Sequence, residues 1–407
     1  MEVLYPRCAG LDVHSELVVA CARIAEGRQI RRESAEFGTS TRELLRLQEW
    51  LQSHGVTHVA MEATGVYWKP VWHILEGSFE LVLGNARQMS TVPGRKSDQN
   101  DASWIADLQA HGLIRPSFVP PRRTQELRDL TRTLKQMMGE HARHVQRIQK
   151  VLEDANIKLT SVLSDIMGVS GRKILGALAD GERNPEKLAG LADPRVKAPR
   201  AKMVEALRGH VTEHHRFMLS LHLRQAEAVE AGVAAVEAQI EKALEPFRRE
   251  VELLCTVPGV KTNAAAAILA EIGADMSVFP SADHLVAWAA LSPGLNKSGG
   301  KTKSSRTRPA RWLKSTMTQC AWAASHQRDC YLNARFHRIK SRRGSKKAVI
   351  AVANTMLRAI YHMLKNDVPY QDLGADFFDR EHRDRTVRRL ATRLKNLGYE
   401  VELRKAA

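Results

Sequence analysis

The sequence lacks several features that would assign it to common protein classes. No apolar run reaches about 18 residues, so we expect no membrane-spanning helix. The opening segment, MEVLYPRCAGLDVHSE, lacks a basic stretch followed by a long apolar one, and no secretory signal peptide is expected. The five cysteines are scattered, odd in number and without a C-x-x-C pair, which favours reduced thiols in a cytoplasmic protein. The glycine-rich stretch KSGGKTKSS lacks the G-x-x-x-x-G-K-[ST] pattern of a P-loop, and no strand is expected before it.

Acidic residues are nearly absent from one segment. Residues 297–347 hold 15 lysines and arginines and a single acid, Asp329, so this segment carries +14 of a total net charge of +17. Residues 1–114, in contrast, carry −3. Such asymmetry indicates a polyanionic partner, of which nucleic acid is the commonest. A solvated basic face is the alternative, but so many cations in 51 residues would repel one another if unmatched.

The chain is long enough for two or three domains with real cores, and its 43% hydrophobic and 26% charged content is typical of globular proteins. The first ~115 residues alternate between short apolar runs and helical patterns. Their order is three strands, helix, strand, helix, strand, helix, which is the order of an α/β RNase H-like (RuvC-like) fold. The prolines of IRPSFVPPRR then mark a domain boundary.

Long helices are predicted for the middle of the chain, over residues 124–163 and 201–245, with short helices and turns between them. A coiled-coil hairpin, a dimer seam and an ordinary helical bundle remain open. We therefore expect four segments: 1–115, the metal-site domain; 120–248, a helical or coiled-coil spacer; 249–368, a mainly α-helical domain; and 369–407, a charged tail. The apolar stripes consist of Leu127, Leu130, Leu134 and Met137 in the first helix and Val229, Val233, Val236, Ile240 and Leu244 in the second.

The third segment starts with a helix, the turn VPGVK and an alanine-rich helix, which together predict a helix-hairpin-helix element. Gly259 would let the backbone approach a phosphate, and the helix N-terminus that follows favours an anion. Further along, KKAVIAVANTMLRAIYHMLKN predicts a strongly apolar helix, and RTVRRLATRLKNLGY an amphipathic one.

Two aspartates, Asp98 and Asp101, lie three residues apart in GRKSDQNDASWIADL. One interpretation is that Asp98 caps a helix and Asp101 lies in its first turn. The other is a metal site, because Asp12 ends the predicted first strand and Glu62 the fourth, and these strands are neighbours in an RNase H-like sheet. Four converging carboxylates need cations between them, and hard oxygen ligands select Mg²⁺ or Mn²⁺. A two-metal site of this kind supports phosphodiester transfer.

The segments GLDVHSE, MEATGVYW, KSDQNDASWIADL, VPGVKTNAAAAILAEIG and LSPGLNKSGGK resemble the signatures of the DEDD-type transposases of bacterial insertion sequences, the RNA-guided bridge recombinases. The resemblance covers almost the whole chain. It implies that Asp12, Glu62, Asp98 and Asp101 form the metal site and that Ser298 is the nucleophile that joins DNA covalently. It also implies a structured guide RNA and a dimer or tetramer, in which the acids of one subunit act with the serine domain of another.

Nucleic-acid contacts are expected in the turn and in the basic segment. Without the resemblance, the residues alone favour a loop serine that hydrogen-bonds a phosphate over a nucleophile at Ser298. The histidines His210, His214 and His215 lack the cysteines or acids of a zinc site and favour a surface or phosphate-contacting cluster. The tryptophans Trp68, Trp288, Trp312 and Trp322 are expected in the core rather than as base-stacking platforms. The expected nucleic-acid ligands are Gly259, Lys261, Lys297, Lys301, Lys303, Arg306, Arg308, Arg311, Lys340, Arg342 and Arg343.

The sequence therefore predicts a DNA transposase or recombinase that cuts and rejoins strands through a phosphoserine with Mg²⁺. One alternative is a RuvC-like, structure-specific endonuclease that hydrolyses junction DNA with water. Another is a non-catalytic DNA- or RNA-binding protein, for which four converging acids would be a poor choice.

Overall fold

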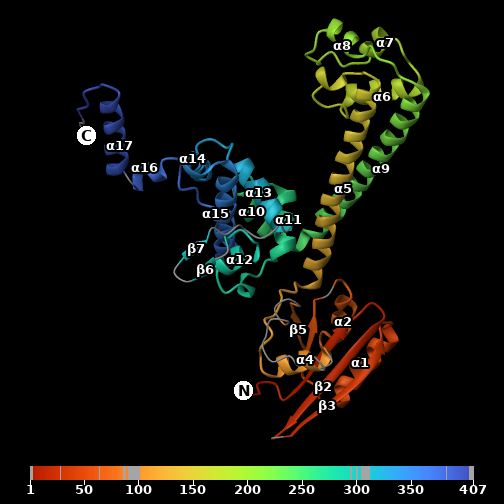
Figure 1. Cartoon of the computed structure of the whole chain (residues 1–407), viewed down its shortest axis with the longest axis vertical. Helices are drawn as coiled ribbons and strands as arrows, with labels where there is room; N and C mark the ends of the chain where they lie inside the picture. The colour runs from red at the N-terminus through yellow and green to blue at the C-terminus, as the bar shows by residue number, and fades with distance from the viewer. Residues whose placement is uncertain are drawn as a thin grey trace. The chain divides into compact units, whose positions relative to one another are not determined.

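The computed structural model describes residues 3–27, 29–63, 65–85, 89, 101–293, 296–298, 301–303, 312–381 and 383–402. The chain divides into two compact units, Met1–Val119 and Pro120–Ala407 (Figure 1). Within the described ranges, no helix is both long and apolar enough to cross a membrane.

The first unit is built on a five-stranded mixed sheet with the strand order β3-β2-β1-β4-β5. The first three strands form an antiparallel meander, whereas β4 and β5 run parallel to β1. The predicted α/β unit is confirmed at this level. The strands are β1 (Arg7–Val13), β2 (Leu17–Glu26), β3 (Gln29–Gly38), β4 (His58–Glu62) and β5 (Glu80–Gly84).

Helices cover both faces of this sheet (Figure 1). On one face, α1 (Thr41–Ser53) and α2 (Trp68–Leu75) pack leucines such as Leu47 and Leu75 against Leu11 and Met61 of the strands. On the other face lies α4 (Asp101–Ala110), whose Ile105 and Leu108 join a smaller core. Because side chains alternate along a strand, β4 and β5 contribute to both cores, with Ala60 and Val82 on the α4 side.

The second unit begins with two long helices, α5 (Arg122–Asp154) and α9 (Glu213–Ala243), which pack side by side as an antiparallel hairpin (Figure 1). The predicted single helix over 201–245 is wrong. A short helix, α8 (Arg200–Ala206), precedes a break, and α9 starts only after Thr212. The reason is a capping box: the Thr212 hydroxyl accepts the His215 N–H, and His215 Nδ1 accepts the Thr212 N–H at 3.1 Å.

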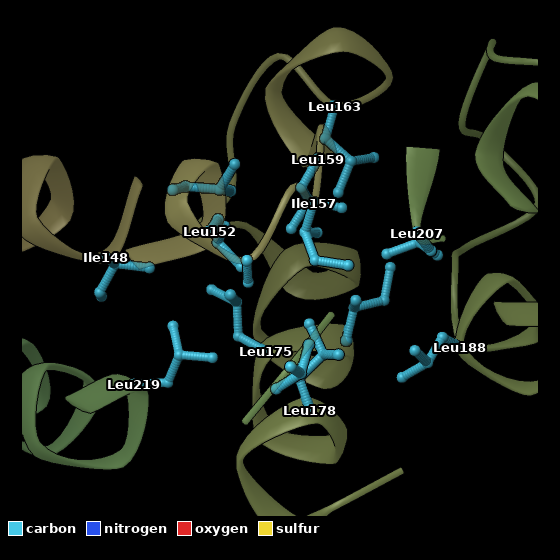
Figure 2. Packing of buried hydrophobic residues seen from close by; sticks show 14 of the residues in the cluster. Ile148, Leu152, Ile157, Leu159, Leu163, Leu175, Leu178, Leu188, Leu207 and Leu219 are labelled. Carbon is cyan, nitrogen blue, oxygen red and sulfur yellow. The ribbon is translucent and has the colours of Figure 1, made fainter. Parts of the chain in front are cut away.

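A separate hydrophobic core closes the far end of this hairpin. It is formed by α6 (Val169–Asp180), α7 (Pro185–Gly190), α8 and the short η1 helix (Leu159–Ser161) against the ends of α5 and α9. Figure 2 shows leucines and isoleucines from these elements interdigitating. The long hairpin is therefore fixed by tertiary packing at its tip, not by the helix–helix seam alone.

The rest of the second unit is mainly helical. Its central helix is α15 (Ser345–Asn366), the predicted apolar helix. This helix packs against α12 (Ala282–Trp288), α13 (Trp312–Ala324) and α14 (Tyr331–Arg343). The other elements are η2 (Glu245–Phe247), α10 (Arg248–Cys255), α11 (Thr262–Ile272), η3 (Met276–Val278), β6 (Asn296–Ser298), β7 (Lys301–Lys303), α16 (Phe377–Glu381) and α17 (Arg383–Asn396).

Candidate active site and nucleic-acid interface

The α4 side of the sheet carries the first two candidate acids. On β1, Leu11 belongs to the core under α1 and α2, so Gly10 and Asp12 point to the opposite side, toward α4. On β4, Ala60 packs with Ile105 of α4, so Glu62, two residues later, points the same way. Asp12 and Glu62 therefore share one face of the sheet.

These two acids also occupy equivalent places along their strands. The parallel pairing of β1 with β4 matches Leu11 with Met61, so Asp12 and Glu62 are the next residues on the two strands. Both are partly exposed at the carboxyl edge of the sheet, where parallel α/β sheets commonly present functional side chains.

The third acid reaches this edge through the direction of α4. A Cβ on Gly10 would lie 2.2 Å from the carbonyl oxygen of Ala102, so the helix backbone rests directly on β1 at that glycine. The other end of α4 lies near the start of the strand, because the Ala110 carbonyl accepts the Leu4 N–H at 2.8 Å. The helix thus runs antiparallel to β1, and its first residue, the exposed Asp101, lies toward the carboxyl edge. Asp98 lies outside the described residues.

The chemistry of the donor set suits a hard divalent cation, because such ions prefer carboxylate oxygens and these acids belong to elements that reach one edge of the sheet. Among the residues that the structure describes, no group of three or more histidine, cysteine, aspartate or glutamate side chains forms a preformed metal site. Asp12 is instead hydrogen-bonded to His14, whose Nε2 lies 3.1 Å from Asp12 Oδ2. The sequence reasoning missed His14, although its place two residues after Asp12 puts it on the same side of the chain.

A buried ion pair fixes the rest of α4 to the sheet. Arg23 of β2 is 1% exposed and donates its Nε–H to Asp107 of α4 at 2.9 Å, while Arg32 of β3 donates to the same carboxylate at 2.8 Å. Beside them, burial raises the pKa of the Cys8 thiol to about 12. This thiol is therefore a packing group and not a nucleophile.

The candidate serine lies in a short hairpin of the second unit. Strands β6 and β7 pair antiparallel, and Ser298, the last residue of β6, is matched with Lys301, the first residue of β7. Lys297 and Lys303 belong to the same two strands. Only the backbone of these strands is described, and Arg306, Arg308 and Arg311 lie outside the described residues.

The turn between α10 and α11 requires a glycine because another helix packs closely against it. Gly259 has φ +82°, and a Cβ there would lie 2.4 Å from the carbonyl oxygen of Cys320 in α13. The α13 backbone thus occupies the side on which a Cβ would project. Lys261 is exposed at the start of α11. A phosphate contact at this turn stays a prediction.

A second set of candidate ligands gathers where α14 ends. Lys340, Arg342 and Arg343 lie in its last turn and are exposed, so they can bind a polyanion without burying an unpaired charge.

Two residues differ in exposure from what the sequence predicted. His215 is buried, and its Nε2 lies 2.9 Å from Asp154 Oδ2 at the end of α5, which corrects the expectation of a surface position for this histidine. His210 and His214 are exposed, as expected. Trp322, expected in the core, is 50% exposed.

Comparison with known proteins assigns the family. A family model described as Transposase, of the DEDD type found in IS110 elements, matches residues 9–157. A second, described as Transposase IS116/IS110/IS902 family, matches residues 251–338. The chain belongs to the IS110 family of transposases. This transposase is also 24% identical over 329 residues to the insertion element IS900 uncharacterized 42 kDa protein of Mycobacterium paratuberculosis, across 71% of this chain and 80% of that protein.

The matched regions of the transposase contain all the candidate acids and Ser298. Transposases cut and rejoin DNA, so DNA is its partner and the chain is an enzyme of that general kind. The resemblance expected from the sequence motifs is thereby confirmed at the level of the family.

A joint between α5 and the C-terminal helices of the transposase was not foreseen. Glu271 at the end of α11 is 6% exposed and accepts two hydrogen bonds from Arg132, at 2.7 and 2.9 Å, while Arg128 donates to its backbone carbonyl at 3.0 Å. Arg132 and Lys135 also lie over the ring of Trp312, the first residue of α13, at 5.4 and 5.8 Å. No local spacing marks this joint, because its ion pair spans 139 residues.

Proposed function

We propose that this transposase cuts and rejoins DNA strands through Ser298, with a divalent metal ion held by Asp12, Glu62, Asp98 and Asp101. The observation that carries the proposal is the placement of Asp12 and Glu62 at matched positions on one face of the sheet, with α4 bringing Asp101 toward the same edge. Helix capping alone accounts for Asp101 but gives no reason for two carboxylates at matched positions near the ends of β1 and β4.

An RNase H-like, RuvC-like fold for the first unit is part of the proposal. A three-stranded antiparallel meander followed by two parallel strands, in the order β3-β2-β1-β4-β5, supports it. So does α4, which packs on the central strands opposite α1 and α2. A coiled coil between α5 and α9 is supported by their packing along the hairpin and by the contact of Met137 with Gly232.

The chemistry we infer conserves the number of phosphoester bonds. The Ser298 hydroxyl loses its proton, its oxygen bonds to phosphorus, and the bond from phosphorus to one nucleotide oxygen breaks; that oxygen takes up a proton. Attack by a hydroxyl of another strand end reverses these steps, so rejoining needs no ATP. A metal ion bound by the carboxylates would lower the pKa of a nucleophile and stabilise charge on the phosphate. Mg²⁺ suits these oxygen ligands, and Mn²⁺ is an alternative.

The partners we infer are the DNA of the element ends and target, a structured guide RNA, and further copies of the chain as a dimer or tetramer. The +14 charge of residues 297–347 supports the nucleic-acid partners. The turn at Gly259 and Lys261 is proposed as a helix-hairpin-helix contact with a phosphate backbone.

The test is Ser298→Ala, incubated with element-end DNA and the flanking non-coding RNA and examined on a denaturing gel. A phosphate-contacting serine contributes about 1 kcal/mol, or roughly fivefold in affinity, whereas a nucleophile supplies the bond-forming atom. We expect binding within about fivefold of the wild type, no cleavage and no covalent adduct. The double variant Ser304→Ala with Ser305→Ala is the control and should keep the adduct.

Peptide mapping of the trapped adduct identifies the linked residue. A phosphoryl linkage at a residue other than Ser298 overturns the assignment. Cleavage by the wild type without any linkage would replace the proposal with a hydrolytic, RuvC-like endonuclease. Metal-independent binding without cleavage would indicate a non-catalytic binding protein.

A further inference from the structure

The C-terminal helix α17 presents an apolar stripe to solvent. Val387, Leu390, Leu394 and Leu397 follow a three-four-three spacing and are 36%, 50%, 43% and 66% exposed. This spacing places them on one side of the helix. Exposed apolar side chains in a line, rather than scattered singly, indicate a surface that another protein surface covers.

The same helix is strongly basic. Residues 383–396 carry six cations and one acid, a net charge of +5. Of these cations, Arg388, Arg389, Arg393 and Lys395 are described and exposed. A partner for α17 must therefore offer an apolar floor with acidic residues around it.

One groove of this chain has that chemistry. It lies between the end of α9, α10 and the start of α11, and its volume is about 700 Å³. Its apolar lining includes Ala238, Leu244 and Val251. The charged residues at its border are Glu237, Glu241, Glu245, Glu252 and Arg248, a net of −3 in a chain of +17.

Two of these acids form no ion pair with any residue that the structure describes. Glu245 pairs with Arg248, and Glu237 accepts a hydrogen bond from Asn263 at 3.2 Å. Glu241 and Glu252 are exposed and form no ion pair within the described part of the chain. In a basic protein, unpaired acids beside an apolar floor favour a basic, amphipathic ligand.

The tail that carries α17 is held elsewhere in its own chain. The rings of Phe377 and Phe378 contact the ring of Tyr331 at 5.2 and 5.3 Å, and Arg338 lies 4.7 Å over Phe378. The Tyr331 N–H donates to Asp372 at 2.9 Å. The segment before α17 is therefore fixed to the start of α14, while the stripe and the groove are both open in a single copy.

We propose that α17 of one copy docks in the groove formed by α9, α10 and α11 of a second copy. A reciprocal exchange covers both stripes and both grooves in a two-fold arrangement. Nucleic acid is a poorer occupant of the stripe, because a phosphate backbone does not bury leucines and the acids of the groove repel it.

The test is directed cross-linking of full-length chains. Cys255 is exposed and lines no part of this groove, so Cys255→Ser is made first to remove the competing thiol. One preparation then carries Leu394→Cys and the other Ala238→Cys, and the two are mixed with a short bismaleimide. We expect a cross-linked heterodimer. Gln239→Cys, exposed on α9 but outside the groove lining, is the matched control and should give much less product.

Each other outcome overturns the proposal. No cross-link above the control shows that the helix does not occupy the groove. In a chain that carries both Leu394→Cys and Ala238→Cys, a cross-link only within single chains assigns the groove to the chain's own tail. Loss of the heterodimer on adding DNA, with protection of the Leu394→Cys thiol, assigns α17 to nucleic acid.

Charge exchange tests the electrostatic part separately. Arg389→Glu with Arg393→Glu should weaken the cross-linking or self-association by about tenfold, as should Glu241→Lys with Glu252→Lys. All four substitutions together should restore it to within about threefold of the wild type. If the combined variant is as weak as either pair alone, the complementarity is not used.

Discussion

At the scale of single residues, Gly10 decides where α4 lies. Glycine is required at this position for lack of space and not for a special backbone conformation, because a Cβ would clash with the helix backbone at Ala102 and Ala106. The glycine allows the helix to approach β1 closely, and that approach brings the start of α4 toward the carboxyl edge of the sheet, where Asp12 is the last residue but one of β1.

Gly10→Ala should therefore displace α4 and cost about 1–3 kcal/mol in the free energy of unfolding, as overpacked sites do. Strand cleavage should fall as well, because Asp101 moves with the helix. Urea unfolding and a cleavage assay on the same preparation measure both effects. The control is Gly139→Ala in α5, where a Cβ meets nothing within 4 Å and helix propensity predicts a gain of up to about 1 kcal/mol. Equal stability for wild type and Gly10→Ala would contradict the packing assignment.

Substitution of Asp101 tests whether this residue is a metal ligand or only a favourable charge at the start of a helix. As a first-turn acid alone, Asp101→Asn should cost about 1 kcal/mol or less and leave cleavage intact. As a ligand, it should abolish cleavage and adduct formation at saturating Mg²⁺ with little change in the melting temperature. A titration of cleavage against Mg²⁺, run beside thermal unfolding, makes the measurement. Normal cleavage with a lowered melting temperature would remove the metal role.

At the scale of elements, the joint between α5 and α11 connects the helical hairpin to the C-terminal helices. Glu271 is buried and accepts hydrogen bonds from Arg132 with both carboxylate oxygens, while the Arg132 side chain remains partly exposed. A buried ion pair contributes little net stability when intact but leaves an uncompensated charge when one partner is removed. The joint also includes Trp312, the first residue of α13.

Glu271→Ala should thus destabilise the protein by about 3 kcal/mol, the lower end for a broken buried pair because the Arg132 side chain is 35% exposed. Replacing both partners, Glu271→Leu with Arg132→Met, should recover much of this loss. Guanidinium unfolding gives the free energies. The control is Glu153→Ala, which breaks the exposed pair with Lys158 and should cost less than about 1 kcal/mol. A loss of that small size for Glu271→Ala would show that the joint is not buried in solution.

At the scale of the whole molecule, the charge is concentrated in one segment rather than spread over the surface. Nucleic-acid affinity should accordingly fall steeply with salt, with a log–log slope of several units at about 0.9 per duplex phosphate contact. Replacing Lys340, Arg342 and Arg343 by Gln should flatten this slope without changing which DNA site is chosen. Filter binding across a salt series measures it.

A charge-matched control separates this effect from net charge. Arg143, Arg147 and Lys150 are exposed on α5, outside the basic segment, and their replacement by Gln should leave the slope nearly unchanged. Equal flattening by both triples would mean that total charge, and not the end of α14, governs binding.

Much of the architecture could be predicted from local pattern. Strand alternation and helical spacing are properties of neighbouring residues, so the mixed sheet and the apolar helix over 345–366 followed from them. The start of α9 could not be predicted from local pattern. Residues 207–212 interrupt the helix where they pack against the end of α5, and the capping box of Thr212 and His215 then begins α9. The four-acid site itself stays a prediction.

Composition and short spacing were sufficient to place Glu62 at the end of a strand and to show where the positive charge gathers, because both depend on neighbouring residues, whereas β1 extends one residue beyond the expected end at Asp12. Contacts between distant segments place Asp12 and Glu62 on one face of the sheet, pack the α13 backbone against Gly259 and bring Glu271 against Arg132. The physical reason is that register, close packing and buried ion pairs join residues far apart in the chain. Their energies depend on which surfaces meet, and no short stretch of sequence contains that information.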